Sequence, residues 1–345
     1  MRCLMTTGEA IYGRTFATMV LRAFAVAALL ASTYAASVPS PQERCGGAAQ
    51  PSCNRAVPRA TVCNGHAQLC GRSYGNVTFM GSHDSAFFSS DPFALARDQE
   101  VDIPTQLGLG VRMLQSQAHM NGGVIHFCHT SCALFDGGTV LAYLQTVKSW
   151  LDANPNEVLT LLFTNPEGLS IPNVWAPAFV QSGTVGIASI AFVPPQNPMP
   201  QSAWPTLGSM IDSGKRVVIF LDAGADGSDG TPVNYILPEF TQIWETPFDS
   251  TNAAFPCSVD RIDTSKLSVA DHMYIINHFL DIDIFGILLS DPEEAGTTNG
   301  VSSIVADAHG CVPLSQANRL PNFVLLDFVN LGTGMAAINQ LNGVS

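Results

Sequence analysis

Gly81-Ser82-His83-Asp84-Ser85 is the stretch around which the rest of the chain is organised. It follows Asn76-Val77-Thr78-Phe79-Met80, a run rich in strand formers, so we expect a strand over residues 77–81 with the His-Asp pair at its C-terminal end. Gly81 and the small Ser82 let the backbone turn there at little steric cost. An imidazole beside a carboxylate can move protons near neutral pH, although a loop histidine next to a turn-forming aspartate fits these five residues equally well.

Further strand-like segments follow along the chain, and several of them are separated by helical segments. We expect strands at residues 110–117, 124–129, 157–164, 216–221 and 323–328, helices at 139–152 and 207–213, a loop and short helix at 91–107, and a loop-rich region at 165–205. Strands alternating with helices over about 280 residues indicate a parallel α/β fold, and a barrel fits this length. No glycine-rich phosphate-binding motif opens a helix, which argues against a nucleotide-binding fold.

Composition narrows the class of protein further. The 345 residues are 46% hydrophobic and only 12% charged, so a large core is expected and disorder is not. The formal net charge of −13 argues against nucleic-acid binding and against electrostatic docking to anionic lipid.

The first residues have the layout of a secretory signal. Residues 20–36 carry Arg22 and then an apolar run that ends in small residues, and this run is too short to favour a transmembrane helix. We therefore expect a signal peptide at 1–36, with Met19 as the true start, a Cys-rich lead-in at 37–73 and a barrel at 74–345. No lipid-anchor signal and no transmembrane segment are expected, and the protein is predicted to be extracellular.

Cysteine usage fits the same compartment. Eight cysteines remain when Cys3 is removed with the signal, and an even number in a secreted chain predicts disulfides whose pairing stays open: Cys45, Cys53, Cys63, Cys70, Cys128, Cys132, Cys257 and Cys311. The segment Cys63–Cys70 also invites reading as a zinc loop, but its spacing does not suit one.

Polar side chains fall at several of the expected strand ends. They are His83-Asp84, the stretch with Gln115, Gln117 and His119, then His129 and Asp327, with Asp222 and Glu245 as further candidates. In a barrel such side chains converge on one mouth, where two histidines with carboxylate partners suit paired acid–base chemistry. Arg112 fits either a phosphate clamp or a structural ion pair. Trp244-Glu245-Thr246-Pro247 fits either the mouth or a helix end before proline.

Together these segments resemble a known family. The run Val77–Ser85, then residues 106–114, then His126-Phe127-Cys128-His129-Thr130, then Asn154-Pro155-Asn156-Glu157, is similar to the X domain of phosphatidylinositol-specific phospholipase C, most of all to the secreted fungal branch of PLC-like phosphodiesterases. The similarity covers most of residues 74–335 in order. It implies a distorted (β/α)8 TIM-type barrel that cleaves the glycerol–phosphate bond of phosphoinositides.

The resemblance also implies roles for single residues. His83 matches the general base and Asp327 the carboxylate that orients it, while His129 matches the general acid and Asp84 its partner. The chain departs from the family at Gln115 and Gln117, which replace an Asp and a phosphate-binding Arg, and at Asn165, which follows the strand where bacterial enzymes carry a Lys near the inositol. A neutral amide is a weaker phosphate ligand than a guanidinium and does not supply calcium-binding charge.

We therefore expect a secreted, monomeric phosphodiesterase with metal-independent catalysis and no cofactor. Its substrate is expected to be a phosphodiester, and a phospholipid at a membrane surface is one option. The catalytic residues are His83, His129, Asp84 and Asp327, and the expected substrate contacts are Arg112, Gln117, Asn165, Asp222 and Glu245. Two alternatives stay open: a metal-dependent glycerophosphodiesterase-type barrel, which needs an acidic cluster with His at the mouth, and a non-catalytic secreted protein that keeps the barrel.

Overall fold

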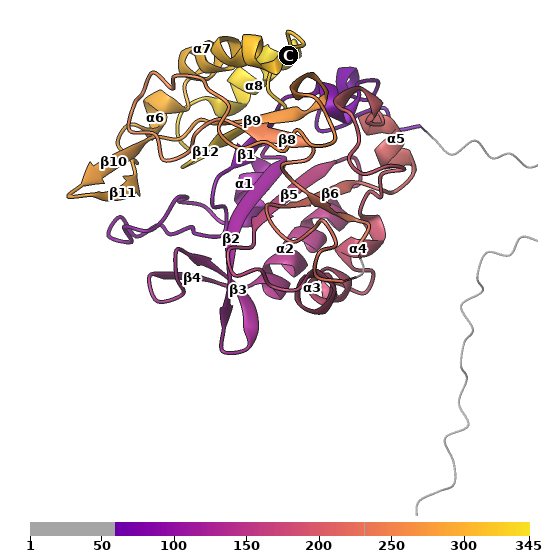
Figure 1. Cartoon of the computed structure of the whole chain (residues 1–345). Helices are drawn as coiled ribbons and strands as arrows, with labels where there is room; N and C mark the ends of the chain where they lie inside the picture. Colours follow the sequence, from indigo (N-terminus) through magenta and orange to yellow (C-terminus); the bar gives the residue numbers. More distant parts are fainter. Residues whose placement is uncertain (1–58, 231) are drawn as a thin grey trace, which may run out of the picture. The chain divides into compact units, whose positions relative to one another are not determined.

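Eight parallel strands follow one another around a strongly curved sheet in the order of the chain (Figure 1). The computed structural model describes residues 59–345 except Thr231. The hydrogen-bonded order is β7-β6-β5-β2-β1-β12-β9-β8, and within these residues no pairing joins β7 to β8. The architecture is thus a (β/α)8 barrel with one open seam, which confirms the predicted distorted barrel. The expected signal peptide and most of the lead-in lie outside the described residues.

The secondary-structure elements have the following bounds. The barrel strands are β1 (Phe79–Ser82), β2 (Met113–Asn121), β5 (Leu159–Thr164), β6 (Val217–Leu221), β7 (Ile236–Pro238), β8 (Ile243–Glu245), β9 (Met273–Asn277) and β12 (Phe323–Leu326). Two hairpins add β3 (Val124–His129) with β4 (Phe135–Thr139) and β10 (Asp281–Ile284) with β11 (Ile287–Ser290). The helices are α1 (Ile103–Gly108), α2 (Val140–Ala153), α3 (Ala176–Gln181), α4 (Ile187–Ile190), α5 (Leu207–Asp212), α6 (Ala295–Thr298), α7 (Val301–Cys311) and α8 (Gly334–Asn342).

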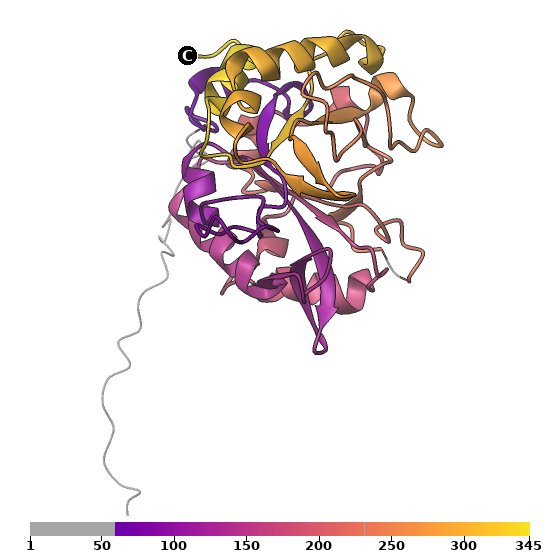
Figure 2. The ribbon, with the colours of Figure 1, turned by 90° about the vertical axis from the view of Figure 1, so that its left-hand side faces the viewer.

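Short turns of 3-10 helix complete the chain at η1 (Ala67–Leu69), η2 (Tyr74–Asn76), η4 (Gln201–Ala203), η5 (Val269–Asp271) and η6 (Val312–Ser315), with a π turn at η3 (Ile171–Trp175). The helices lie outside the curved sheet, and Figure 2 shows the orange-yellow α7 on one side and the magenta α2 on the other, with the strands between them. Within the described residues no helix is long and apolar enough to cross a bilayer.

Alternation along the strands separates two hydrophobic cores. Phe79 packs in a core that fills the barrel, whereas its neighbour Met80 packs in the core between the strands and the surrounding helices. Successive strand residues point to opposite faces, so strands buried on both faces read as continuous apolar runs. A Cβ atom on Gly81 would lie 2.5 Å from Cδ2 of Leu325, so a side chain at this position in β1 would displace Leu325.

The N-terminal end of the barrel is closed by the segment before β1. Tyr74 packs its ring 4.8 Å from Trp204 and 5.3 Å from Phe79, and its hydroxyl lies 2.6 Å from Oγ1 of Thr160 near the start of β5. The side chains at this end are therefore used for packing, and the opposite end, where the strands finish, is left for a site.

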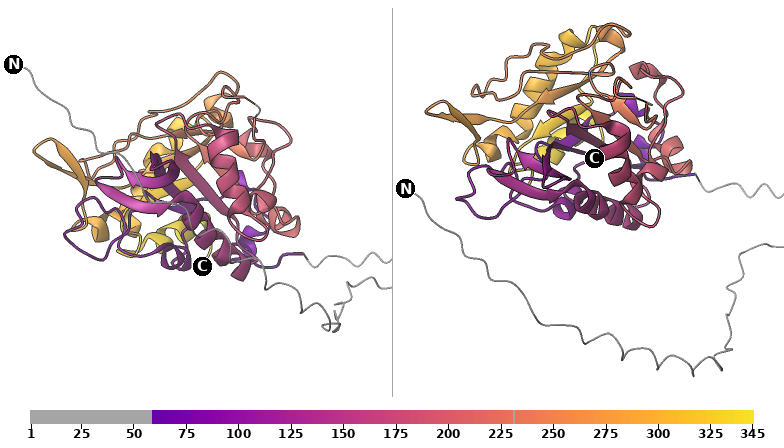
Figure 3. Two further views of the ribbon diagram at one scale, coloured as in Figure 1. Left: turned by 90° about the horizontal axis from the view of Figure 1, so that it is seen from below. Right: turned by 60° about the horizontal axis from the view of Figure 1, so that its bottom comes forward.

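The segment at 124–129 is a strand as predicted, but it is not one of the barrel strands. β3 pairs antiparallel with β2, with Phe127 opposite Ala118, because Gly122 and Gly123 both have positive φ and form a tight hairpin turn. β3 consequently runs back along β2 and returns its last residue, His129, toward the barrel. The other hairpin, β10–β11, projects from the body of the barrel (Figure 3).

Several elements carried no clear sequence signal. β7 and β8 are three residues each, and β9 and α7 were not expected either. The interpretation of Trp244-Glu245 as a helix end is wrong, because both residues belong to β8, which pairs with β9. The expected helix at 139–152 is confirmed as α2, where the Thr139 side chain accepts a hydrogen bond from the Ala142 N–H.

Three disulfides are formed by six of the eight predicted cysteines. They join Cys63 to Cys70, Cys128 to Cys132, and Cys257 to Cys311. The first pairing confirms that Cys63–Cys70 is not a zinc loop, and Cys45 and Cys53 lie outside the described residues.

Candidate active site

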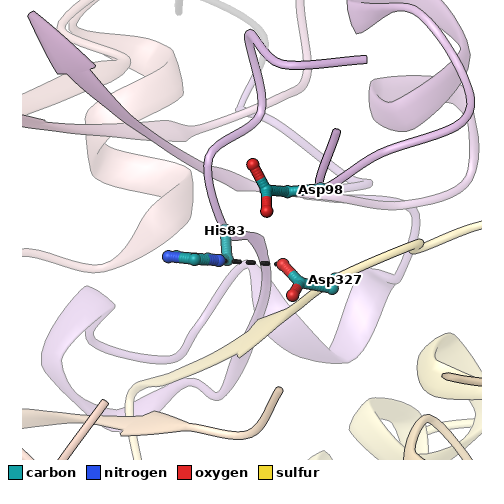
Figure 4. Close-up of side chains that lie close together, drawn as sticks. All are labelled: His83, Asp98 and Asp327. Carbon is teal, nitrogen blue, oxygen red and sulfur yellow. Dashed lines mark hydrogen bonds and ion pairs between the residues drawn. The ribbon is translucent and has the colours of Figure 1, made fainter. Parts of the chain in front are cut away.

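His83 stands at the point where β1 ends, and its ring is held on two sides. Nδ1 lies 2.8 Å from Oδ1 of Asp327, which follows β12, the strand paired with β1 (Figure 4). The imidazole also stacks on the ring of Phe279, with centroids 3.8 Å apart and planes 6° from parallel. With Nδ1 bound and the ring fixed, Nε2 is the nitrogen available to a molecule in the cavity.

The pKa of His83 is the result of opposing effects. Burial lowers it, but the charges of Asp327, Asp84 and Asp98 together with the Asp327 hydrogen bond outweigh burial and raise the pKa to about 10. The imidazole is therefore a cation at neutral pH, and its neutral, proton-accepting form becomes more abundant as the pH rises toward 10.

Asp84 lies between the two candidate histidines. Its Oδ2 atom is 3.8 Å from Nε2 of His83 and 3.5 Å from Nε2 of His129. The backbone of Asp84 adopts a left-handed conformation with φ of 41°, and its N–H donates to Oε1 of Gln115 at 2.7 Å. The side chain is fully buried, and burial is the main reason that its pKa is raised.

Gln117 serves the same carboxylate. Its Nε2 donates to Oδ2 of Asp84 at 2.9 Å, and its Oε1 accepts from the Thr130 N–H at 3.2 Å. The NH₂ group and the oxygen of the Gln117 side-chain amide are thus both used, one to hold Asp84 and the other to hold the loop after β3. The two glutamines that depart from the resembled family position a carboxylate here.

His129 reaches the cavity from the end of β3. Its Nε2 lies 3.7 Å from Oδ2 of Asp98 in addition to its approach to Asp84, and its ring packs 5.2 Å from that of Phe87. The disulfide from the adjacent Cys128 to Cys132 constrains the turn that follows. The antiparallel return of β3 is what brings this histidine next to His83.

Asp98 is a part of the site that the sequence did not indicate. It lies in the loop between β1 and α1, with only 2% of its surface exposed, and its Oδ1 accepts a 2.6 Å hydrogen bond from Oγ of Ser290 in β11. Its Oδ2 is buried without a hydrogen-bond partner, and burial raises the pKa of Asp98 well above its usual range. Figure 4 shows it beside the His83–Asp327 pair. No motif surrounds Asp98, so only the folded loop identifies it.

A second group of polar side chains stands at the ends of β6, β7 and β8. Asp222, Glu239 and Glu245 follow or end these strands, and Arg261 forms an ion pair with Glu245. Burial raises the pKa of Asp222, and burial together with the charge of Glu245 raises that of Glu239 well above its usual range. Glu239 and Arg261, like Asp98, were not predicted.

The two groups line one cavity of about 240 Å³. Three of the predicted substrate contacts line it, namely Gln117, Asp222 and Glu245. Among the described residues, Arg261 is the one Arg or Lys in its wall. Seven carboxyl side chains contribute to the same wall: Asp84, Asp98, Asp222, Glu239, Glu245, Asp249 and Asp281. The cavity is thus strongly acidic.

The structure does not bring Arg112 or Asn165 into the cavity. Nε of Arg112 donates to Glu157 at 2.8 Å and its Nη1 donates to backbone carbonyls, so the structural ion pair is the arrangement found. Asn165 is buried and exchanges hydrogen bonds with the backbone of Leu169, so it shapes the loop after β5. His119 lies beyond the barrel mouth, where it pairs with Glu167 at 3.0 Å.

Metal ligation is sterically conceivable only on the histidine side. Within the described residues, two sets of potential ligands have donor atoms within 4.8 Å of one another: His83 with Asp98 and Asp327, and Asp84 with Asp98 and His129. Each set includes one of the two histidines that are candidates for proton transfer.

Comparisons with known proteins identify the family of the chain. Residues 69–342 match the sequence profile of the family described as PI-PLC X 1. The chain is 42% identical over 296 residues to the PI-PLC X domain-containing protein 1 of Arthroderma benhamiae, covering 84% of this chain and 92% of that protein. It is 39% identical over 289 residues to an uncharacterized secreted protein of the same fungus, covering 81% of this chain and 62% of the relative.

A solved structure shares the fold. The phosphatidylinositol-specific phospholipase C of Staphylococcus aureus with incorporated pentafluoro-Phe superposes with a TM-score of 0.50 at 15% identity, covering 78% of this chain and 93% of that one. Because the family match spans most of the chain and the 42% identical relative is covered almost end to end, this chain belongs to the PI-PLC X family.

Proposed function

We propose that this chain is a secreted phosphodiesterase of the phospholipase C type, in which His83 and His129 perform metal-independent acid–base catalysis. Membership of the PI-PLC X family supports the reaction class. Secretion is supported by the signal-like residues 20–36 and by the relative named as a secreted protein.

One observation carries the proposal: the Nε2 atoms of both histidines lie within 4 Å of the same carboxylate oxygen, Oδ2 of Asp84. Two imidazoles at this spacing can serve the two sides of one phosphorus atom. Asp327 fixes the tautomer of His83, so the roles of the two rings differ, as an acid and a base require.

The proton transfers balance as follows. Nε2 of His83 takes the proton of the nucleophile, which is water or a hydroxyl of the substrate, as the new oxygen–phosphorus bond forms. The bond between phosphorus and the leaving oxygen breaks, and Nε2 of His129 donates its proton to that oxygen. Asp327 stabilises the imidazolium created at His83.

The test is turnover of a generic chromogenic phosphodiester without an amine, bis(p-nitrophenyl) phosphate, by the purified protein with and without chelator. His83→Ala and His129→Ala are each expected to lower kcat/KM by about 10²–10⁴. In the double mutant the two losses should not multiply, because groups that act as a unit have non-additive effects. His126→Ala is the matched control, because His126 lies on the same strand as His129 but pairs with Asp136 outside the cavity. Full activity of a folded His83→Ala or His129→Ala variant, or restoration of chelated enzyme by calcium or magnesium, contradicts the proposal.

A non-catalytic binding protein is the second candidate. It is favoured because Arg112 lies outside the cavity and because the NH₂ group and the oxygen of the Gln117 side-chain amide are both already hydrogen-bonded. Among the described residues, Arg261 is then the one Arg or Lys in the cavity wall. A wild-type protein that binds phosphate esters yet cleaves no phosphodiester at any pH between 5 and 11 would establish this candidate.

A further inference from the structure

The half of the cavity opposite the histidines carries more negative than positive groups. Asp222, Glu239 and Glu245, which we call the acidic subsite, stand at the C-terminal ends of three successive strands, β6, β7 and β8. The N–H of Glu239 donates to the carbonyl of Leu221 at 2.9 Å, which fixes the ends of β6 and β7 side by side. Three carboxyl groups therefore converge where the barrel has its open seam.

One guanidinium faces these three carboxyl groups, and it is already engaged. Arg261 forms an ion pair with Glu245, and its guanidinium carbon lies 4.6 Å from the ring centroid of Phe248 and 5.2 Å from that of Phe240. Asn277 adds a 3.3 Å hydrogen bond to the same carboxyl group of Glu245. These contacts satisfy Glu245. The charge of Arg261 also acts on Glu239 and Asp222, and the Asn165 N–H donates to Oδ1 of Asp222 at 2.7 Å, but within the described residues neither carboxyl group forms an ion pair with Arg261.

A buried orphan atom shows where a partner is missing. Oε1 of Glu239 has no hydrogen-bond partner, although Glu239 is 2% exposed and lines the cavity. An unpaired buried polar atom is costly, so such an atom in a cavity wall indicates a ligand. Burial is the main cause of the raised pKa values of Glu239 and Asp222. The charge of Glu245 raises both further, and a hydrogen bond to Glu245 also raises the pKa of Glu239, so an added cation would relieve this negative field.

The spacing of the acidic subsite favours an organic cation over a metal ion. The described residues contain two sets of potential metal ligands with donor atoms within 4.8 Å of one another, and both are on the histidine side. Asp222, Glu239 and Glu245 do not form such a set, so their oxygens are spread more widely than the coordination shell of one small ion. An alkylammonium group is larger and is held by charge and apolar contact rather than by short bonds.

We infer that the acidic subsite binds a positively charged amine, so that the preferred substrate is a phosphodiester of an amino alcohol of the choline or ethanolamine type. The statement that such a molecule is a substrate rests on the proposed function, whereas the statement that the acidic subsite binds an amine does not. The phosphate would lie at the histidines, and the amine would extend across the cavity to Glu239 and Asp222. An inositol head group, which is a neutral polyol, would leave the charge of the acidic subsite uncompensated.

The experiment measures binding of three phosphate monoesters by calorimetry: phosphocholine, its uncharged carbon isostere 3,3-dimethylbutyl phosphate, and inositol 1-phosphate. All three share the phosphate, and as monoesters they report affinity without turnover. We expect phosphocholine to bind at least about ten-fold more tightly than either of the others, as one added ion pair in a partly buried site implies. The preference should grow with rising pH, because the pKa of Glu239 is raised and its ionised form, which attracts the ammonium, becomes more abundant as the pH rises.

Two variants locate the amine. Glu239→Gln and Asp222→Asn are each expected to reduce the ten-fold preference to about three-fold or less, and the half-buried Asp222 provides a second variant should the buried Glu239 prove necessary for folding. Asp226→Asn is the control, because it removes an exposed carboxylate that does not line the cavity. Melting temperatures verify that each variant is folded.

Equal affinity for phosphocholine and its uncharged isostere overturns the inference, and so does a preference that survives both variants. Tighter binding of inositol 1-phosphate identifies a polyol subsite instead. Binding of calcium or magnesium that is lost in Glu239→Gln assigns the acidic subsite to a metal ion. Because the proposed function is judged by turnover of a diester and this inference by affinity for monoesters, either can fail while the other stands.

Discussion

Asp327→Asn tests the electrostatic core of the proposed mechanism. The substitution keeps the size of the side chain but removes the charge that lies 2.8 Å from Nδ1 of His83, in a pair whose side chains are only 16% and 5% exposed. Asp327 is the largest of the influences that raise the pKa of His83 to about 10, and an opposite charge at such a distance shifts a pKa by about 1–3 units. Without it, the pKa of His83 is expected to fall by about that amount.

The sign of the effect on the rate follows from the role of His83 as a base. In the wild type, the fraction of His83 in its neutral, proton-accepting form rises with pH up to about 10, so kcat/KM for a phosphodiester should rise over the pH range in which His129 keeps the proton that it donates. In Asp327→Asn the midpoint of this rise should move down by about 1–3 pH units. The plateau should also fall by about 10²–10⁴, because an amide can offer its NH₂ group to Nδ1 and no longer fixes the tautomer.

The assay is a profile of kcat/KM between pH 5 and pH 11, with circular dichroism and thermal melting at each end of the range. Asp212→Asn, which removes an exposed carboxylate remote from the cavity, is the control and should leave the midpoint in place. The reasoning is refuted by a folded Asp327→Asn variant whose profile has the same shape and position as that of the wild type.

The remaining predictions concern stability, ion pairing and covalent structure. The pKa values of Asp281 and His83 are raised to about 7 and about 10, so the folded state binds protons that the unfolded chain has released. The melting temperature should therefore fall as the pH rises from about 4 to 10, and a rise in melting temperature across that range contradicts the acidic cavity. Asp98→Asn mimics the protonated carboxyl group and should flatten this decline, whereas an unchanged slope would mean that Asp98 is already ionised. Arg112→Met should lower the free energy of unfolding by about 1–3 kcal/mol in urea titrations while kcat/KM stays unchanged, and lost activity in the folded variant would revive the phosphate clamp. Peptide mapping of unreduced protein should recover the pairs Cys63–Cys70, Cys128–Cys132 and Cys257–Cys311, and alkylation of any of these six thiols before reduction opposes the pairing.

Local patterns in the sequence were sufficient for the centre of the barrel. The apolar runs that form β5 and β6 are buried on both faces and therefore read as parallel strands, and the helix at 140–153 carries its own cap and its own apolar stripe. The His83-Asp84 pair was placed correctly at a strand end, because a run of strand-forming residues followed by Gly81 is a signal that depends only on neighbouring residues. These features depend on residues close together in the chain.

The other half of the site depends on contacts that no local pattern contains. Asp98 reaches the histidines because a loop folds back onto β11, and Glu239 and Glu245 reach the cavity because strands of three residues join a sheet that other strands have already formed. A three-residue strand has too little periodicity to be recognised, and its pairing partners are distant in the sequence.

The sequence by itself therefore determined the fold class and a histidine–carboxylate pair at the end of the first strand. The tertiary structure alone decided that β3 turns back to bring His129 to His83, that Arg112 is used by Glu157, and that the cavity is acidic. The physical reason is that strand and helix signals arise from neighbouring residues, whereas the charge and pKa of a site are set by side chains that meet only after the barrel has closed.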